Sequence, residues 1–288
     1  MLAAVDLRLY PKSDVELPHP CAHLVYAAVL DAVRSVDPAL SKALHADVQT
    51  KPIAVSTMWS RVRATGDSLS IPKYTECRVR ICTLTKVVFE ALSEAIFPMV
   101  ASYGEIRLGG STFVLLSAGF EQPYGGTADY SDLLQRSRRE VMLRFTSPVT
   151  FRRSGVNVPL PEPTLVYQSL WQKWQAFSDV PISESVFEQM VRAMAVNALD
   201  GHTRVWKFPR YKMTGFVGVV GYELVNKVSE DAARLFSGLS ELAFYSGVGY
   251  KTTMGMGQCR LIDSESHVIG SEGSEDAPGA ELDGRSVR

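Results

Sequence analysis

Residues 247–260, GVGYKTTMGMGQCR, place a lysine and two threonines between two pairs of glycines. Because glycine has no Cβ atom, main-chain N–H groups can approach a ligand closely there, while lysine and threonine add a charge and hydroxyl donors. This chemistry suits a polyanion such as a nucleic-acid backbone. The candidate binding residues are Gly247, Gly249, Lys251, Thr252, Thr253, Gly255 and Gly257.

Two other interpretations of the glycine-rich stretch conflict with its place in the chain. A dinucleotide fingerprint, G-x-G-x-x-G, follows a strand and opens a helix, whereas these glycines follow a helical pattern and precede a strand pattern. A Walker loop requires G-K-[ST], but Tyr250 precedes Lys251. Two alternatives stay open: a loop that contacts phosphates, and a turn that only connects two elements.

Strand and helix patterns alternate over residues 1–118. Apolar periodicity predicts strands at 2–10, 51–59, 77–84 and 103–117, and helices at 23–36, 38–46 and 86–97. The last of these helices is predicted to end before Pro98, because proline disrupts a helix interior. The order β-α-β-β-α-β is typical of a ferredoxin-like domain.

A second, similar unit is predicted over residues 140–263, after a loop-rich linker at 119–139. Strands are predicted at 140–152 and 257–262, a strand pair at 203–225, and helices at 163–177, 183–199 and 230–246. Ser183 is the expected N-cap of the second of these helices. The chain is therefore predicted to be an α+β protein with two tandem ferredoxin-like, RRM-like domains.

The net charge of the chain is unevenly distributed. The whole sequence carries 30 basic and 31 acidic residues. Residues 264–288 hold six of the acids and two arginines, which leaves 28 bases and 25 acids in the rest. We expect residues 264–288 to be a disordered acidic tail, attached to a mildly basic folded part that permits a basic groove.

The remaining composition excludes several classes of protein. No stretch approaches the roughly 20 apolar residues that a membrane span requires, and no signal peptide is recognisable, so a cytoplasmic protein is expected. The four cysteines are scattered, without a CxxC pair or a histidine at zinc-finger spacing. They are expected to be reduced thiols, and no metal or cofactor is predicted.

Four segments in order along the chain match one known family. LHADVQTKPIAVS at 44–56, LRFTSPVTFRRSG at 143–155, GFVGVVGYEL at 215–224 and AFYSGVGYKTTMGMGQCRLI at 243–262 are similar to segments of one group of nucleases. The chain thus resembles the CRISPR-associated repeat RNA-processing endoribonucleases, the Cas6 family of the RAMP superfamily. The resemblance spans nearly the whole chain to about residue 262.

This resemblance implies both a fold and a function. The fold is a pair of ferredoxin-like domains that face each other across a cleft. The function is metal-independent cleavage of precursor CRISPR RNA within its repeats by 2′-hydroxyl attack, which leaves a guide RNA with a 2′,3′-cyclic phosphate. The implied partners are the CRISPR repeat RNA and other effector subunits, with the protein as a monomer or homodimer.

The resemblance also implies catalytic residues. Family members with a tyrosine, a histidine and a lysine in the site space the last two like His45 and Lys51, so these residues are expected to share those roles. The matching tyrosine position holds Leu30, and Tyr26 lies one helical turn earlier. His23 is the alternative assistant, because some members use a second histidine on the first helix. The competing interpretation of His45 is a surface residue that ends a helix.

Basic residues of the second unit are candidate phosphate contacts. The predicted RNA-binding residues are Arg152, Arg153, Arg204 and Lys207, with Arg210 and Lys212 nearby. Half of them are expected to be ordinary solvated charges. Trp171 and Trp174 share a helical face and are expected in the core. His19 precedes Pro20 and is expected to be a loop residue, while His202 is expected to be structural or RNA-facing.

Two alternative functions remain. A non-catalytic RAMP subunit that binds processed guide RNA in an effector complex would share both domains and the glycine-rich loop, but it would need no histidine. A nucleotide-dependent enzyme that uses the loop for a mononucleotide is the less favoured alternative.

Overall fold

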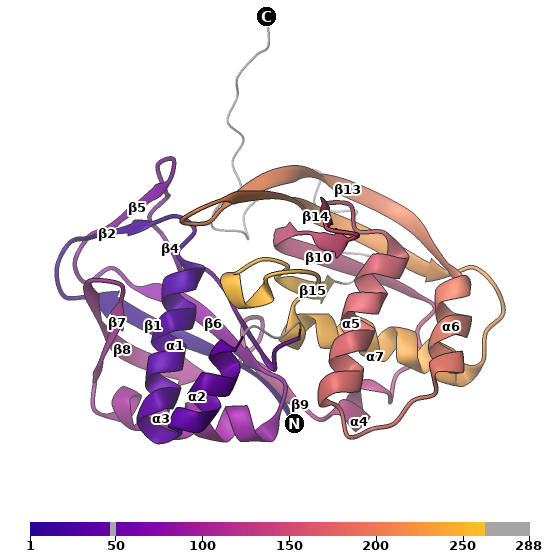
Figure 1. Cartoon of the computed structure of the whole chain (residues 1–288), viewed down its shortest axis with the longest axis horizontal. Helices are drawn as coiled ribbons and strands as arrows, with labels where there is room; N and C mark the ends of the chain where they lie inside the picture. The colour runs from indigo at the N-terminus through magenta and orange to yellow at the C-terminus, as the bar shows by residue number, and fades with distance from the viewer. Residues whose placement is uncertain (47–49, 263–288) are drawn as a thin grey trace, which may run out of the picture.

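The computed structural model describes residues 1–46 and 50–262, which form two α+β halves lying side by side (Figure 1). The predicted tail at 264–288 and His267 lie outside the described residues. No helix among the described residues is long and apolar enough to cross a membrane.

The N-terminal half is built on one antiparallel sheet with the order β3-β6-β1-β8-β7, in which β4 also pairs with β6 and β9 with β1. Helices α1 and α3 connect its strands in the order β-α-β-β-α-β, as the periodicity predicts. The elements are β1 Leu2–Pro11, β2 Val15–Pro18, α1 Ala22–Val36, α2 Pro38–His45, β3 Ile53–Val55, β4 Trp59–Ser60, β5 Ser68–Ile71, β6 Cys77–Thr83, α3 Lys86–Ala101, β7 Glu105–Leu108, β8 Ser111–Gly119 and β9 Gly126–Ala128.

The C-terminal half repeats this topology with the strand order β13-β14-β10-β15. When the four main strands of each half are numbered along the chain, they lie side by side in the order 2-3-1-4 in both sheets. The prediction of two ferredoxin-like domains is therefore confirmed. The elements are α4 Tyr130–Leu133, β10 Glu140–Val149, β11 Phe151–Arg153, β12 Val156–Val158, α5 Pro163–Phe177, α6 Glu184–Arg192, β13 Met194–Lys207, β14 Lys212–Leu224, α7 Glu230–Ser246, the short 3₁₀ helix η1 Thr252–Met254 and β15 Cys259–Ile262.

Two predicted helix boundaries are wrong. Helix α3 continues through Pro98 to Ala101, since Pro98 lies in the last turn and its carbonyl accepts the N–H of Ser102. The helix predicted at 183–199 begins as expected at the Ser183 cap but ends at Arg192. From Met194 onward the chain pairs with β14, and this long-range pairing overrides the apolar spacing.

Helix α7 lies between the two sheets. Twelve of its 17 residues are buried, so it is covered on nearly all sides rather than along one stripe. Its residues Leu239 and Leu242 share one core cluster with Leu2 and Cys82 of the N-terminal sheet and with Leu143 of β10. One apolar cluster therefore contains residues of both halves and of α7, and the chain that leaves α7 emerges at their junction.

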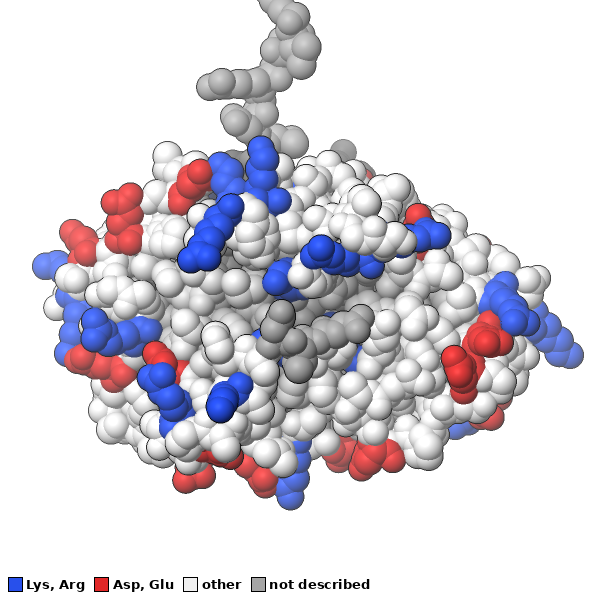
Figure 2. All heavy atoms as spheres, in the orientation of Figure 1, with Lys and Arg blue, Asp and Glu red and all other residues white. Residues whose placement is uncertain are grey.

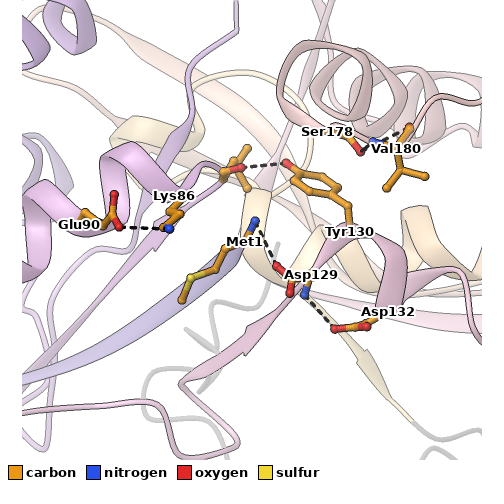
Figure 3. A network of polar contacts seen from close by, with 9 residues as sticks. Met1, Lys86, Glu90, Asp129, Tyr130, Asp132, Ser178 and Val180 are labelled. Carbon is orange, nitrogen blue, oxygen red and sulfur yellow. Dashed lines mark hydrogen bonds and ion pairs between the residues drawn. The ribbon is translucent and has the colours of Figure 1, made fainter.

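The segment between the halves is also packed. Strand β9 pairs with β1, and α4 follows it. The Tyr130 hydroxyl donates to the Leu84 carbonyl at 3.0 Å (Figure 3). The Tyr130 ring also lies edge-on to Trp174 of α5, with centroids 5.1 Å apart. Asp129 forms an ion pair with the amino group of Met1. Residues 126–133 thus attach the first half to the second.

Candidate functional site

The C-terminal end of α2 lies against α1. Helix α2 begins where the Asp37 side chain accepts the N–H of Leu40, with Pro38 in its first turn. At the other end, the Tyr26 hydroxyl of α1 donates to the Leu44 carbonyl at 2.6 Å. This bond fixes the last turn of α2, and with it the position of His45, on the surface of α1.

The structure brings Tyr26, His45 and Lys51 together. The Lys51 Nζ atom donates to the Tyr26 hydroxyl at 3.4 Å and to the His45 carbonyl at 3.5 Å. It also lies 5.4 Å from the centroid of the Tyr26 ring, a cation–π geometry. Although Leu30 occupies the position expected for a tyrosine, Tyr26 one turn earlier reaches the lysine and no shift of the helix is needed.

These three side chains differ in exposure. His45 is exposed, Lys51 is half-buried and Tyr26 is buried. Burial raises the pKa of Tyr26 to about 12, so its hydroxyl stays protonated at neutral pH and serves as a hydrogen-bond donor rather than as a base. The exposed imidazole of His45 is the most accessible of the three groups, and the half-buried Lys51 is the next.

The other histidines lie in separate surroundings. His23 is half-buried in the first turn of α1, three residues before Tyr26, and burial lowers its pKa, which favours the neutral imidazole. His19 is half-buried, and burial together with the neighbouring Arg204 lowers its pKa. His202 is exposed on β13.

The glycine-rich loop, residues 247–258, packs tightly against both halves. Its 3₁₀ helix η1 contacts β3 and α1. A Cβ added to Gly255 would lie 2.6 Å from Ala22 Cβ, and one added to Gly257 would lie 1.8 Å from the Val248 carbonyl oxygen. Both glycines also have positive φ angles, +84° and +65°. The shape of the loop therefore requires glycine at these two positions.

Several main-chain N–H groups of this loop are already bonded within the protein. The N–H of Gly249 donates to Ser169 Oγ at 2.8 Å, that of Gly257 to the Pro148 carbonyl at 2.9 Å, and that of Gly247 to the Ala243 carbonyl at 3.0 Å. Glycine thus shapes the loop before it contacts any ligand, and the RNA contacts of the four glycines stay a prediction. Gly247, Thr252, Gly255 and Gly257 are buried, whereas Gly249, Lys251 and Thr253 are half-buried.

An aromatic residue that the sequence reasoning missed lies on this loop. The Tyr250 ring has the Lys251 ammonium 4.9 Å from its centroid and the Arg152 guanidinium 5.7 Å from it. Tyr250 is half-buried, and Arg152 and Arg153 are exposed on β11. An aromatic face flanked by two cations is a common arrangement for stacking a base beside its phosphates, and the signal was the tyrosine placed between glycine and lysine.

A solved Cas6 product complex is 30% identical to this chain, with a TM-score of 0.71, and the match covers 91% of this chain and 100% of the other. The chain belongs to the Cas6 family. A sequence model of the family described as CRISPR-associated endoribonuclease Cas6 matches residues 143–259. A Cas6 substrate mimic complex is 28% identical, with a TM-score of 0.65, over 90% of this chain and 99% of the other.

Curated relatives match over a shorter span. Two CRISPR-associated endoribonucleases Cas6 of Mycobacterium tuberculosis are each 31% identical over 127 residues, which is 43% of this chain and 39% of theirs. The alignment thus spans about two fifths of those relatives. The resemblance to Cas6 and the tandem ferredoxin-like fold are both confirmed.

In this Cas6 family member, β13 and β14 form a long ribbon that reaches from the C-terminal half over the N-terminal half (Figure 1). Basic side chains gather along the upper part of the face shown in Figure 2, over this ribbon. Arg204 is exposed. Lys207 is engaged with both carboxylate oxygens of Asp67, at 2.5 and 2.7 Å, so its charge holds the end of the ribbon to the first half.

The tryptophans belong mainly to the core. Trp171 and Trp174 are buried in α5, as expected. Trp206 is buried against the glycine-rich loop and donates from Nε1 to the Met254 carbonyl at 3.2 Å. Trp59 is half-buried next to the ring of Tyr124.

All four cysteines are free and buried, and burial raises the pKa of Cys77 to about 12, which disfavours a reactive thiolate. Within residues 1–46 and 50–262, no cluster of three or more histidine, cysteine or acidic side chains is arranged to hold a metal ion.

Proposed function

We propose that this chain is an endoribonuclease that cuts precursor CRISPR RNA within its repeats, without a metal ion. The observation that carries this proposal is the contact of Lys51 with both Tyr26 and the end of α2 at His45, in a member of the Cas6 family. On this proposal, residues 1–118 supply the catalytic side chains and residues 140–263 supply most of the RNA contacts.

In the proposed reaction, the ribose 2′-hydroxyl next to the cut attacks the adjacent phosphorus. A base removes the 2′-proton, the new P–O2′ bond forms, and the P–O5′ bond breaks while its oxygen receives a proton. The products carry a 2′,3′-cyclic phosphate and a 5′-hydroxyl. His45 suits either proton transfer because a histidine pKa lies near neutrality.

Lys51 would stabilise the crowded anionic phosphorane through its positive charge. Tyr26 assists by positioning, since its hydroxyl holds both Lys51 and the last turn of α2. His23 would be the second proton-transfer group. It lies in the first turn of α1, one turn before Tyr26 and next to Ala22, and Ala22 packs against the glycine-rich loop. The RNA would then cross α1 between the loop and His45.

RNA would be held by the loop and by basic residues around it. Tyr250 is positioned to stack on a base, with Arg152 and Lys251 beside it for phosphates. Arg153 and Arg204 extend this basic surface, and Lys207 would first have to leave Asp67. Thr253 and the glycines of the loop complete the proposed path.

The test uses the repeat RNA of a CRISPR array beside the coding region. The purified chain is expected to cut it in EDTA, and a single 2′-deoxy nucleotide before the cut is expected to stop cleavage. Mass spectrometry of the 5′ fragment should show the cyclic phosphate. Cleavage of the 2′-deoxy substrate at the normal rate would contradict the proposed mechanism.

A non-catalytic RNA-binding subunit is the alternative function. The grouping of Arg152, Tyr250 and Lys251 favours RNA binding by itself and requires no histidine. Tight binding of unmodified repeat RNA without any cut, under conditions in which the RNA is recovered intact, would support this alternative and overturn the nuclease proposal.

A further inference from the structure

Two buried cations hold the two ends of the glycine-rich loop. Lys173 of α5 donates from Nζ to the carbonyl oxygens of Ser246 and Gly247, at 2.9 and 2.7 Å. Arg80 of β6 donates from Nη2 to Oε1 of Gln258 at 2.6 Å. The loop therefore starts at a cation of the C-terminal half and ends at a cation of the N-terminal half.

Neither positive charge is paired with an acid in the part of the chain that the structure describes. Lys173 and Arg80 are only 6% and 5% exposed, and the ion pairs there include neither of them. Burial lowers the pKa of Lys173 to about 7, so its amine is only partly protonated near neutral pH, and a bound anion nearby would favour the charged form. Arg80 Nε has no hydrogen-bond partner among these residues, and its guanidinium lies 4.6 Å from the centroid of the Phe244 ring.

An unpaired buried charge destabilises the fold unless an anion binds close to it. Buried charges are ordinarily paired, because desolvation strongly disfavours an isolated ion. Shape alone does not require charge here, since Ser169, one turn before Lys173 on α5, holds the same loop by accepting the N–H of Gly249 with a neutral hydroxyl. A negative group bound on the outer side of the loop would supply the missing counter-charge across poorly screened protein.

We propose that Lys173 and Arg80 are positioning residues for RNA: they fix the ends of the glycine-rich loop, and their buried charge attracts the phosphodiester that the loop binds. This inference rests on the proposed function, because it takes RNA as the anion. The two residues act through the loop and touch no phosphate themselves.

The test measures the affinity of full-length variants for repeat RNA that carries a 2′-deoxy nucleotide at the cut. Lys173→Met keeps the length of the side chain and removes the charge, so it is expected to weaken binding about ten-fold. Arg80→Met is expected to weaken it similarly, and Arg80→Lys, which restores the charge, to recover most of the loss. Ser169→Ala is the matched control on the same helix and loop, with an expected loss of about two-fold.

Salt dependence separates this role from a direct contact. Lys251→Met, which removes a charge from the outer side of the loop, should lower the slope of log Kd against log salt by about 0.7. Lys173→Met should leave that slope unchanged. A changed slope for Lys173→Met, or equal losses for Lys173→Met and Ser169→Ala, would overturn the proposal.

A purely structural role predicts a different result. Lys173→Met and Arg80→Met would then lower the melting temperature, while the folded fraction bound RNA with wild-type affinity; this outcome also overturns the proposal. If Lys173→Met does not fold, Lys173→Gln keeps a hydrogen-bond donor without the charge and carries the same expectation. Cleavage is measured separately with unmodified repeat, so a chain that binds but does not cut refutes the nuclease proposal and leaves this one standing.

Discussion

The glycine-rich loop and the end of α2 both lie against α1, yet they are built in different ways. The loop is fixed by its backbone: Gly255 and Gly257 allow close packing, and several of its N–H groups are bonded inside the protein. The end of α2 is fixed by two side chains, the hydroxyl of Tyr26 and the ammonium of Lys51, and it leaves His45 exposed. Changes in the loop should therefore alter stability and binding, whereas changes near His45 should alter the chemistry.

The largest effect is expected on the His45 side. His45→Ala should slow cleavage of repeat RNA by about 10²–10⁴-fold, because general acid–base catalysis contributes that much. RNA affinity should change less than about two-fold, since the exposed imidazole contributes little to the shape of the site. Single-turnover cleavage and binding to 2′-deoxy RNA measure the two quantities. A normal cleavage rate would remove His45 from the mechanism.

On the loop side, Gly257→Ala should destabilise the fold by about 3 kcal/mol or more. The new Cβ would lie 1.8 Å from a backbone carbonyl oxygen, at a positive φ angle. Gly110→Ala, in the turn between β7 and β8, is the matched control, because its new methyl group would have no neighbouring atom within 4 Å and its φ is not positive. Urea unfolding measures both, and similar losses for the two variants would show that the loop tolerates a side chain.

A smaller effect is expected from the pH dependence of stability. Burial lowers the pKa of Lys173 from 10.5 to about 7 in the folded chain. Between these values the unfolded chain binds more protons than the folded one, so the free energy of unfolding should rise with pH. From pH 7 to 8.5 the rise should be about 1–2 kcal/mol greater in the wild type than in Lys173→Met. Urea titrations at both pH values test this, and parallel curves would contradict it.

The smallest effect is expected from Tyr26→Phe. Losing the hydrogen bond to the Leu44 carbonyl should cost about 1 kcal/mol of stability, measured by thermal unfolding. The cleavage rate should fall more than RNA affinity does, because the hydroxyl also holds Lys51. A loss confined to RNA affinity would place Tyr26 with the loop rather than with His45.

Local patterns were sufficient to predict most of the elements. Apolar periodicity predicted the β-α-β-β-α-β order of both halves, and Ser183 marked a helix start correctly. The region after Arg192 was mispredicted because β13 depends on pairing with β14, a contact that periodicity does not encode. The same limit applies to the site: Lys173 bonds Gly247 from 74 positions earlier, and no spacing rule relates the two residues.

The candidate site residues were likewise predictable from the sequence only in part. His45 and Lys51 were selected through the family resemblance, and Tyr26 was an alternative whose reach depended on where α1 lies relative to α2. Tyr250 was missed although it stands between residues that were chosen, because its value for stacking depends on Arg152, which lies on β11 almost a hundred positions away.

The burial of α7 between the two sheets has a consequence for how a substrate is selected. Separating the two halves would disrupt the apolar cluster that they share. The distance between the loop and His45 is therefore set before any ligand binds. An RNA bound at both places would have to span this fixed distance. The cut would then fall at a fixed length of RNA backbone from the phosphate that the loop binds.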